Sequence, residues 1–79
     1  MPVGRASMPL NSLRMGESGS VDNIVGGEIL CKKLMEMGFN KGAVIHVVKN
    51  DSGALIVKVG GTKLVVARGM AQKVMMAEM

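Results

Sequence analysis

Residues that could do acid–base, nucleophilic or metal chemistry are few in this chain. It contains one cysteine, Cys31, and one histidine, His46, and its single aromatic residue is Phe39. A transition-metal site usually needs three or four converging His, Cys, Asp or Glu ligands, and the sequence has no close-spaced motif of these types. We therefore predict no metal site and no bound cofactor.

Catalysis is not indicated either. The chain has no second histidine that could act as general base for a serine, and His46 has no orienting carboxylate nearby in the sequence. The pair Gly26-Gly27 lacks the Gly-Lys-Ser/Thr signature of a phosphate-binding loop. The sequence predicts that this protein is not an enzyme and does not hydrolyse nucleotides.

Length and composition limit the fold to one small domain. With 79 residues, 48% of them hydrophobic, the chain can build a single small core but no deep active-site cleft. Nine methionines are present, a residue that fills irregular gaps in cores and is also common at partner-binding surfaces. These features favour a compact binding module.

The charge pattern bears on partners and location. The net charge of +4 comes from scattered lysines and arginines, and Trp and Tyr are absent, so nucleic-acid recognition is disfavoured. A nucleic-acid-binding barrel would bind oligonucleotides with an affinity that falls steeply as salt is added. One cysteine excludes an internal disulfide, and no apolar run is long enough for a membrane span or a signal peptide. We expect a cytoplasmic protein without direct membrane insertion.

Hydrophobic periodicity indicates which elements position these residues. Residues 1–7 carry no periodic pattern and are expected to form a flexible N-terminal tail, with the domain over 8–79. Leu10 and Leu13 suggest a helical turn that packs against the core. The patterns predict strands over 20–24, 44–49, 54–59, 62–67 and 74–77, a helix over 28–37, and a helical turn within 68–73. The expected fold is mainly β: a small barrel of about five antiparallel strands with one inserted α-helix.

Two glycine positions give this fold specific turns. Leu30, Leu34 and Met37 share the core face of the predicted helix, and Gly38 is placed to cap its C-terminus. Gly60-Gly61 between apolar runs predicts a two-residue β-hairpin turn. In the hairpin, Leu55, Val57 and Val59 would match Thr62, Leu64 and Val66 across the two strands.

The runs "LNSLRMGESGSV", "LMEMGFNKG", "VVK" and "GALIVKVGGTKLVVA", with Ala71 and Val74, resemble the FeoA family of bacterial ferrous-iron uptake. The resemblance implies an SH3-like β-barrel with an inserted helix. It also implies a partnership with FeoB, the membrane iron transporter with a cytoplasmic GTP-binding domain, and neither catalysis nor a cofactor. The family often has Pro-Gly where this chain has Lys41-Gly42, so the turn loses a restriction of φ but keeps its glycine.

A partner-binding surface is the functional site that remains. Once the core face of the helix is assigned, an apolar group around the helix and its exit is unaccounted for: Ile29, Cys31, Met35 and Phe39. We expect these residues to contact the FeoB-type transporter. The competing expectation is that the helix lies flat enough to bury Met35 and Phe39, and burial is the favoured alternative for Phe39. The alternative function is a generic SH3-like adaptor that binds a peptide or strand of another partner, and exposed barrel edges make weak self-association a further expectation.

Overall fold

The computed structural model describes residues 7–51 and 53–78 of the chain. Most of the predicted N-terminal tail, residues 1–6, lies outside this part; Ser7 lies within it and donates a hydrogen bond from its hydroxyl to the Asp22 carboxylate. In chain order the elements are β1 Met8–Pro9, the 3₁₀ turn η1 Leu10–Ser12, β2 Ser18–Ile24, α1 Glu28–Glu36, β3 Val44–Asn50, β4 Ala54–Val59, β5 Thr62–Ala67, α2 Arg68–Ala71 and β6 Val74–Glu78.

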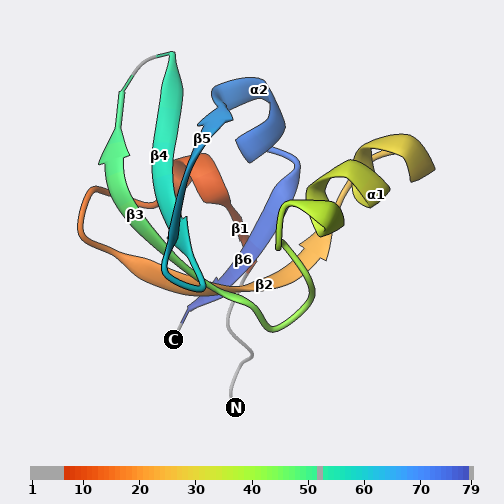
Figure 1. The fold of residues 1–79 in the computed structure, drawn as a ribbon, viewed down its shortest axis with the longest axis horizontal. Coiled ribbons are helices and arrows are strands. Elements are labelled where there is room, and N and C mark those ends of the chain that lie inside the picture. Colours follow the sequence, from red (N-terminus) through yellow and green to blue (C-terminus); the bar gives the residue numbers. More distant parts are fainter. Residues whose placement is uncertain (1–6, 52, 79) are drawn as a thin grey trace.

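The described strands form one antiparallel sheet in the order β1-β6-β2-β3-β4-β5. Figure 1 shows the strands curling around a common interior, with α1 beside the end of β2 at one side of the sheet. The predicted mainly β fold with an inserted helix is therefore confirmed. Residues 7–51 and 53–78 contain six strands where about five were predicted, because the two-residue β1 is too short to show a periodic pattern.

The β4–β5 hairpin has the predicted turn and register. Gly60 and Gly61 have φ angles of 57° and 86°, the positive values that a type I′ turn requires. Val59 pairs with Thr62 directly across this turn. The side-chain pairs that follow are also those expected from the sequence, since Val57 lies opposite Leu64 and Leu55 opposite Val66.

The core lies inside the curled sheet and is built from alternating strand positions. It is closed by η1, which buries Leu10 and is followed by the buried Leu13, as the spacing of these leucines predicted. From the inserted helix and its exit, Leu34 and Phe39 reach this core. The buried hydrophobic residues are Leu10, Leu13, Val21, Leu34, Phe39, Ile45, Val47, Leu55, Val57, Val66, Ala71, Val74 and Met76.

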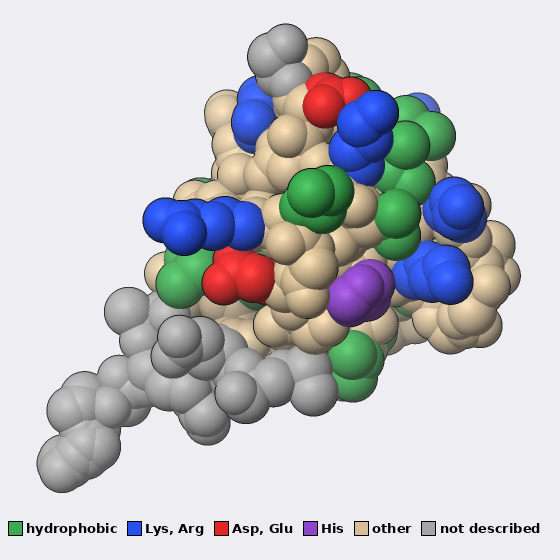
Figure 2. Space-filling view, turned by 90° about the vertical axis from the view of Figure 1, so that its left-hand side faces the viewer, with side chains coloured by type: hydrophobic (Ala, Val, Ile, Leu, Met, Phe, Trp, Pro, Cys, Tyr) green, Lys and Arg blue, Asp and Glu red, His purple; other side chains and the backbone are tan. Residues whose placement is uncertain are grey.

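Charged side chains occupy the outside of the barrel. Figure 2 shows Lys and Arg side chains spread over one face, with the histidine side chain among them. His46 is exposed between the buried Ile45 and Val47, so it points out of the barrel. None of the helices in residues 7–51 and 53–78 has the length and apolar character needed to cross a membrane.

Candidate partner-binding surface

Helix α1 owes its end to a specific backbone motif. Gly38 has a φ of 106°, and its N–H donates to the Met35 carbonyl while the Phe39 N–H donates to the Leu34 carbonyl, each over 3.0 Å. These two bonds form a Schellman motif, which satisfies carbonyls that the helix leaves unpaired. The apolar contact that often accompanies it is supplied by Leu34 and Phe39, both fully buried. The predicted role of Gly38 is confirmed.

The segment after α1 is held against β2. The Gly42 N–H donates to the Val21 carbonyl over 2.7 Å, and the Val21 N–H donates to the Ala43 carbonyl over 2.9 Å. These bonds extend the pairing of β2 beyond its regular ladder with β3. These bonds fix the exit of α1 beside β2, and a hollow lies between residues of β2 on one side and residues of α1 and its exit on the other.

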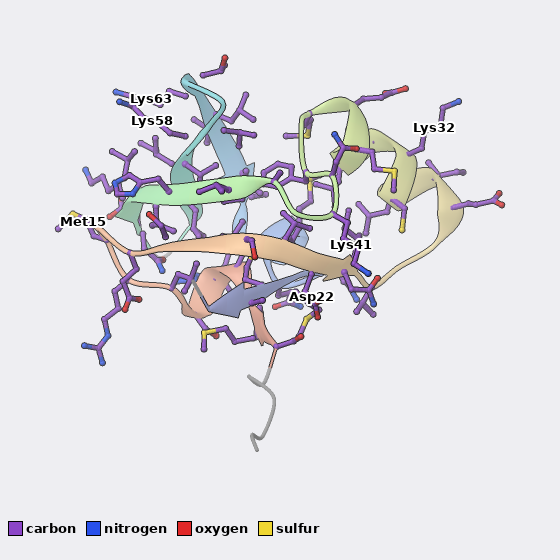
Figure 3. The ribbon with its side chains drawn as sticks, turned by 90° about the horizontal axis from the view of Figure 1, so that it is seen from below. Met15, Asp22, Lys32, Lys41, Lys58 and Lys63 are labelled. Carbon is purple, nitrogen blue, oxygen red and sulfur yellow. The ribbon has the colours of Figure 1, made fainter. Side chains whose placement is uncertain are left out.

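A bulge in β2 shapes the other wall of this hollow. Val21 pairs with Met76 and Asn23 with Met75, so Asp22 is an extra residue on β2 with no partner on β6. The bulge turns the end of β2 and places Asp22 at the rim of the hollow. Figure 3 shows Asp22 and Lys41 near each other at this end of the sheet.

The hollow has a volume of about 450 Å³ and a mixed lining. Apolar side chains lie beside one carboxylate, one amide and one ammonium group. The lining residues are Val21, Asp22, Asn23, Ile24, Cys31, Met35, Phe39 and Lys41. A hollow of this kind suits an apolar side chain of a partner whose neighbouring polar groups reach Asp22 or Lys41.

The chemistry available in the hollow is limited. The half-buried Cys31 thiol lies 3.8 Å from the carbonyl oxygens of both Ile24 and Gly26, so it is a weak donor to the helix entry. His46 hydrogen-bonds Ser18 instead. Within residues 7–51 and 53–78 no three His, Cys, Asp or Glu side chains come close enough to hold a metal ion.

The residues predicted for partner contact divide between three environments. Cys31 and Met35 line the hollow together, and the Met35 side chain is 51% exposed. Ile29 is 86% exposed but lies apart from the hollow, on the outer side of α1 with Lys32, Lys33 and Glu36.

Phe39 is buried, which is the alternative that the sequence favoured for this residue. Its side chain has no exposed area, because the Schellman motif turns it inward beneath α1. It supports the hollow from below and cannot offer an exposed ring to a partner.

Sequence reasoning missed Asp22, Asn23 and Lys41 as lining residues. A bulge leaves no periodic signal in a strand as short as β2, so Asp22 reads as an ordinary polar residue of that strand. Lys41 stands in the turn where the resembling family often has proline, and that departure was the available signal. The structure places its ammonium group at a hollow, where a proline would bring no charge.

Two comparisons with known proteins identify the same family. The family model of the FeoA domain matches residues 8–78. A relative from Methanocaldococcus jannaschii, named as a Fe(2+) transport protein A, is 31% identical over 70 residues, which cover 89% of this chain and 85% of the relative.

Two solved structures share the fold. The crystal structure of an iron uptake regulatory protein, FeoA, is 35% identical with a TM-score of 0.86 and covers 94% of this chain and 99% of its own. The zinc complex of FeoA from Stenotrophomonas maltophilia, described as a prokaryotic SH3 domain protein, is 25% identical with a TM-score of 0.77 and covers 87% of this chain and 88% of its own. The SH3-like character of the fold is thereby confirmed.

Proposed function

Because this chain belongs to the FeoA family of ferrous-iron transport accessory proteins, we propose that it acts by direct contact with a FeoB-type membrane transporter. In this proposal it is a non-enzymatic cytoplasmic protein. It binds the cytoplasmic part of the transporter and thereby alters assembly, nucleotide cycle or gating. The family match spans nearly the whole domain, so the function is expected to reside in this domain itself.

The observation that carries the proposal is the hollow between β2 and α1. Met35 is half exposed at its edge, Phe39 closes it from beneath, and Asp22 and Lys41 provide opposite charges at its rim. An exposed methionine beside a preformed hollow is an adaptable apolar contact. The backbone bonds at the exit of α1 hold this side of the surface in place, which reduces the ordering needed on binding.

The adaptor alternative finds less support. Proline-rich peptides bind in grooves lined by aromatic side chains, and the one aromatic residue of this chain is fully buried. A partner that inserts one apolar side chain into the hollow is a better match to the lining than a polyproline helix.

The test is a binding assay with purified full-length transporter in nanodiscs, with GDP or a non-hydrolysable GTP analogue. Met35→Glu places a charge at the hollow, whereas Met15→Glu makes the same change at a methionine that is 69% exposed. Figure 3 shows Met15 at the opposite end of the sheet from Asp22 and Lys41. We expect Met35→Glu to weaken binding about tenfold, which corresponds to roughly 1.4 kcal/mol, and Met15→Glu to change it less than about twofold.

Each part of the proposal has its own contradicting result. If the wild-type chain does not associate in any nucleotide state, contact with the transporter is wrong. If it associates and Met35→Glu binds as well as wild type, the partner is right and the surface is wrong. Thermal unfolding of both variants checks that the domain stays folded.

A further inference from the structure

A row of polar and cationic side chains crosses the sheet on its outer face. The register places Ser18 of β2 opposite His46 of β3, His46 opposite Lys58 of β4, and Lys58 opposite Lys63 of β5. Residues directly opposite each other in antiparallel strands project from the same face. All four side chains are exposed, so they form a continuous line across four strands, which we name the cationic row.

The histidine in this row is oriented by its neighbour. The Ser18 hydroxyl lies 2.7 Å from Nδ1 of His46 and forms a hydrogen bond with it. This bond fixes the imidazole ring on the sheet surface and leaves Nε2 for a partner. In Figure 2 the histidine lies on the open surface with Lys or Arg side chains beside it.

Lys58 and Lys63 lie directly opposite each other on neighbouring strands. Like charges directly opposite each other on neighbouring strands repel. Among the acidic side chains that the structure describes, none pairs with Lys58 or Lys63, whereas Asp51 pairs with Lys49. Figure 3 shows the two side chains together, far from α1. A bound anionic partner would turn this repulsion into attraction.

Apolar side chains border the cationic row on both sides. Val44 precedes His46 by two residues on β3, and Val65 follows Lys63 by two residues on β5, so both share the outer face. They are 50% and 68% exposed, respectively. Ile56, opposite Val65 and partly exposed, enlarges the apolar border on that side.

We propose that the cationic row binds an acidic, extended segment of a partner protein. Four strands at a spacing of about 4.8 Å make the row roughly 14 Å long, longer than one phosphate group. Along an extended chain, side chains on one side recur about every 6.6–7 Å, so carboxylates two residues apart can reach His46 and Lys58 or Lys63. The bordering valines then contact apolar side chains of the segment. This surface is separate from the hollow at α1, and the proposal does not depend on the transporter contact.

The test is an NMR titration of the ¹⁵N-labelled chain with an eight-residue peptide that alternates glutamate with valine and threonine. The same peptide with glutamine in place of glutamate is the control for charge. We expect saturable shifts confined to the amides around His46, Lys58 and Lys63, and none with the glutamine peptide. Inorganic phosphate and phosphatidylglycerol vesicles are the competing anionic probes, and we expect them to cause no localised shifts.

Paired charge reversals test where the peptide binds. We expect Lys58→Glu with Lys63→Glu to weaken binding about tenfold, a loss of roughly 1.4 kcal/mol. Lys32→Glu with Lys33→Glu makes the same change in net charge on the exposed side of α1 and is expected to alter affinity less than about twofold. Equal losses in both variants, or peptide shifts outside the row, would contradict the proposal. Localised shifts with phosphate or vesicles but not with the peptide would assign the row to another class of ligand.

Discussion

The hollow at α1 and the cationic row are built in different ways, although they belong to the same small domain. The hollow is concave and depends on irregular backbone: the Schellman motif at Gly38, the bulge at Asp22 and the bonds between residues 42–43 and Val21. The cationic row is a line of side chains on paired strands, next to the irregularity between Val47 and Lys49. Its properties depend on the identity of those side chains and on the strand register that places them opposite each other.

This difference separates the effects of substitutions on stability from their effects on binding. Changes that disturb the support of the hollow remove buried contacts and must destabilise the whole domain. Changes in the cationic row replace exposed side chains and leave the core intact. The two surfaces can therefore be distinguished by measuring how a substitution changes the free energy of unfolding and how it changes binding. Three substitutions are expected to change the free energy of unfolding by decreasing amounts.

Phe39→Ala should have the largest effect. Removal of a fully buried aromatic side chain costs about 3–5 kcal/mol, which lowers the melting temperature of a domain of this size by at least about 12 °C. Met15→Ala, at an exposed methionine, is the control and should stay within about 0.5 kcal/mol of wild type. Calorimetry measures both. A shift of only a few degrees for Phe39→Ala would mean that the ring does not support the hollow.

Gly38→Ala should destabilise the domain by an intermediate amount, through backbone strain and through a close contact with Val59. A side chain at a φ of 106° is strained, and its Cβ would lie 3.0 Å from Cγ1 of Val59. Gly42→Ala is the matched control, because its φ is 89° but nothing lies within 4 Å of the added Cβ. We expect about 1–2 kcal/mol for Gly42→Ala and about 1 kcal/mol more for Gly38→Ala in urea unfolding. Equal losses would show that Val59 yields without cost.

Lys63→Glu should have the smallest effect on stability, and it should stabilise the domain rather than destabilise it. It replaces a like-charge pair with an opposite-charge pair across β4 and β5, which should stabilise the domain by about 0.3–1 kcal/mol at low salt. Lys63→Gln removes the repulsion without adding attraction and should fall between the variant and wild type. Chemical unfolding at low salt and at 1 M NaCl measures the gain and its screening. A loss of stability at low salt would contradict the repulsion assigned to this pair.

Local patterns in the sequence were sufficient for most of the fold. The spacing of Leu10 and Leu13 predicted the turn that closes the core, and Gly60-Gly61 predicted a hairpin whose register already places Lys58 opposite Lys63. Gly38 after the helix predicted its C-terminal cap. Each of these features depends on residues close together in the chain, so contacts with distant residues did not alter the predicted local structure.

The features that define the two surfaces needed longer-range information. The inward turn of Phe39 follows from the path of the chain after the helix, and the position of Asp22 follows from pairing between β2 and β6. His46 joins Lys58 only because β3 and β4 pair in one particular register before the irregularity between Val47 and Lys49. Ser18 lay outside the strand predicted from residue 20, so its bond to His46 was missed.

The order of the strands also affects how the protein behaves when it is concentrated. The sheet ends at β1 and β5, and strands at sheet ends offer unpaired backbone groups to other copies. Strand β1 has two residues, too few to start an intermolecular sheet, while β5 carries the exposed Lys63 at its free edge. Lysine on an edge strand is a common defence against aggregation. The weak self-association expected from the sequence remains a prediction, and we expect Lys63 to oppose it.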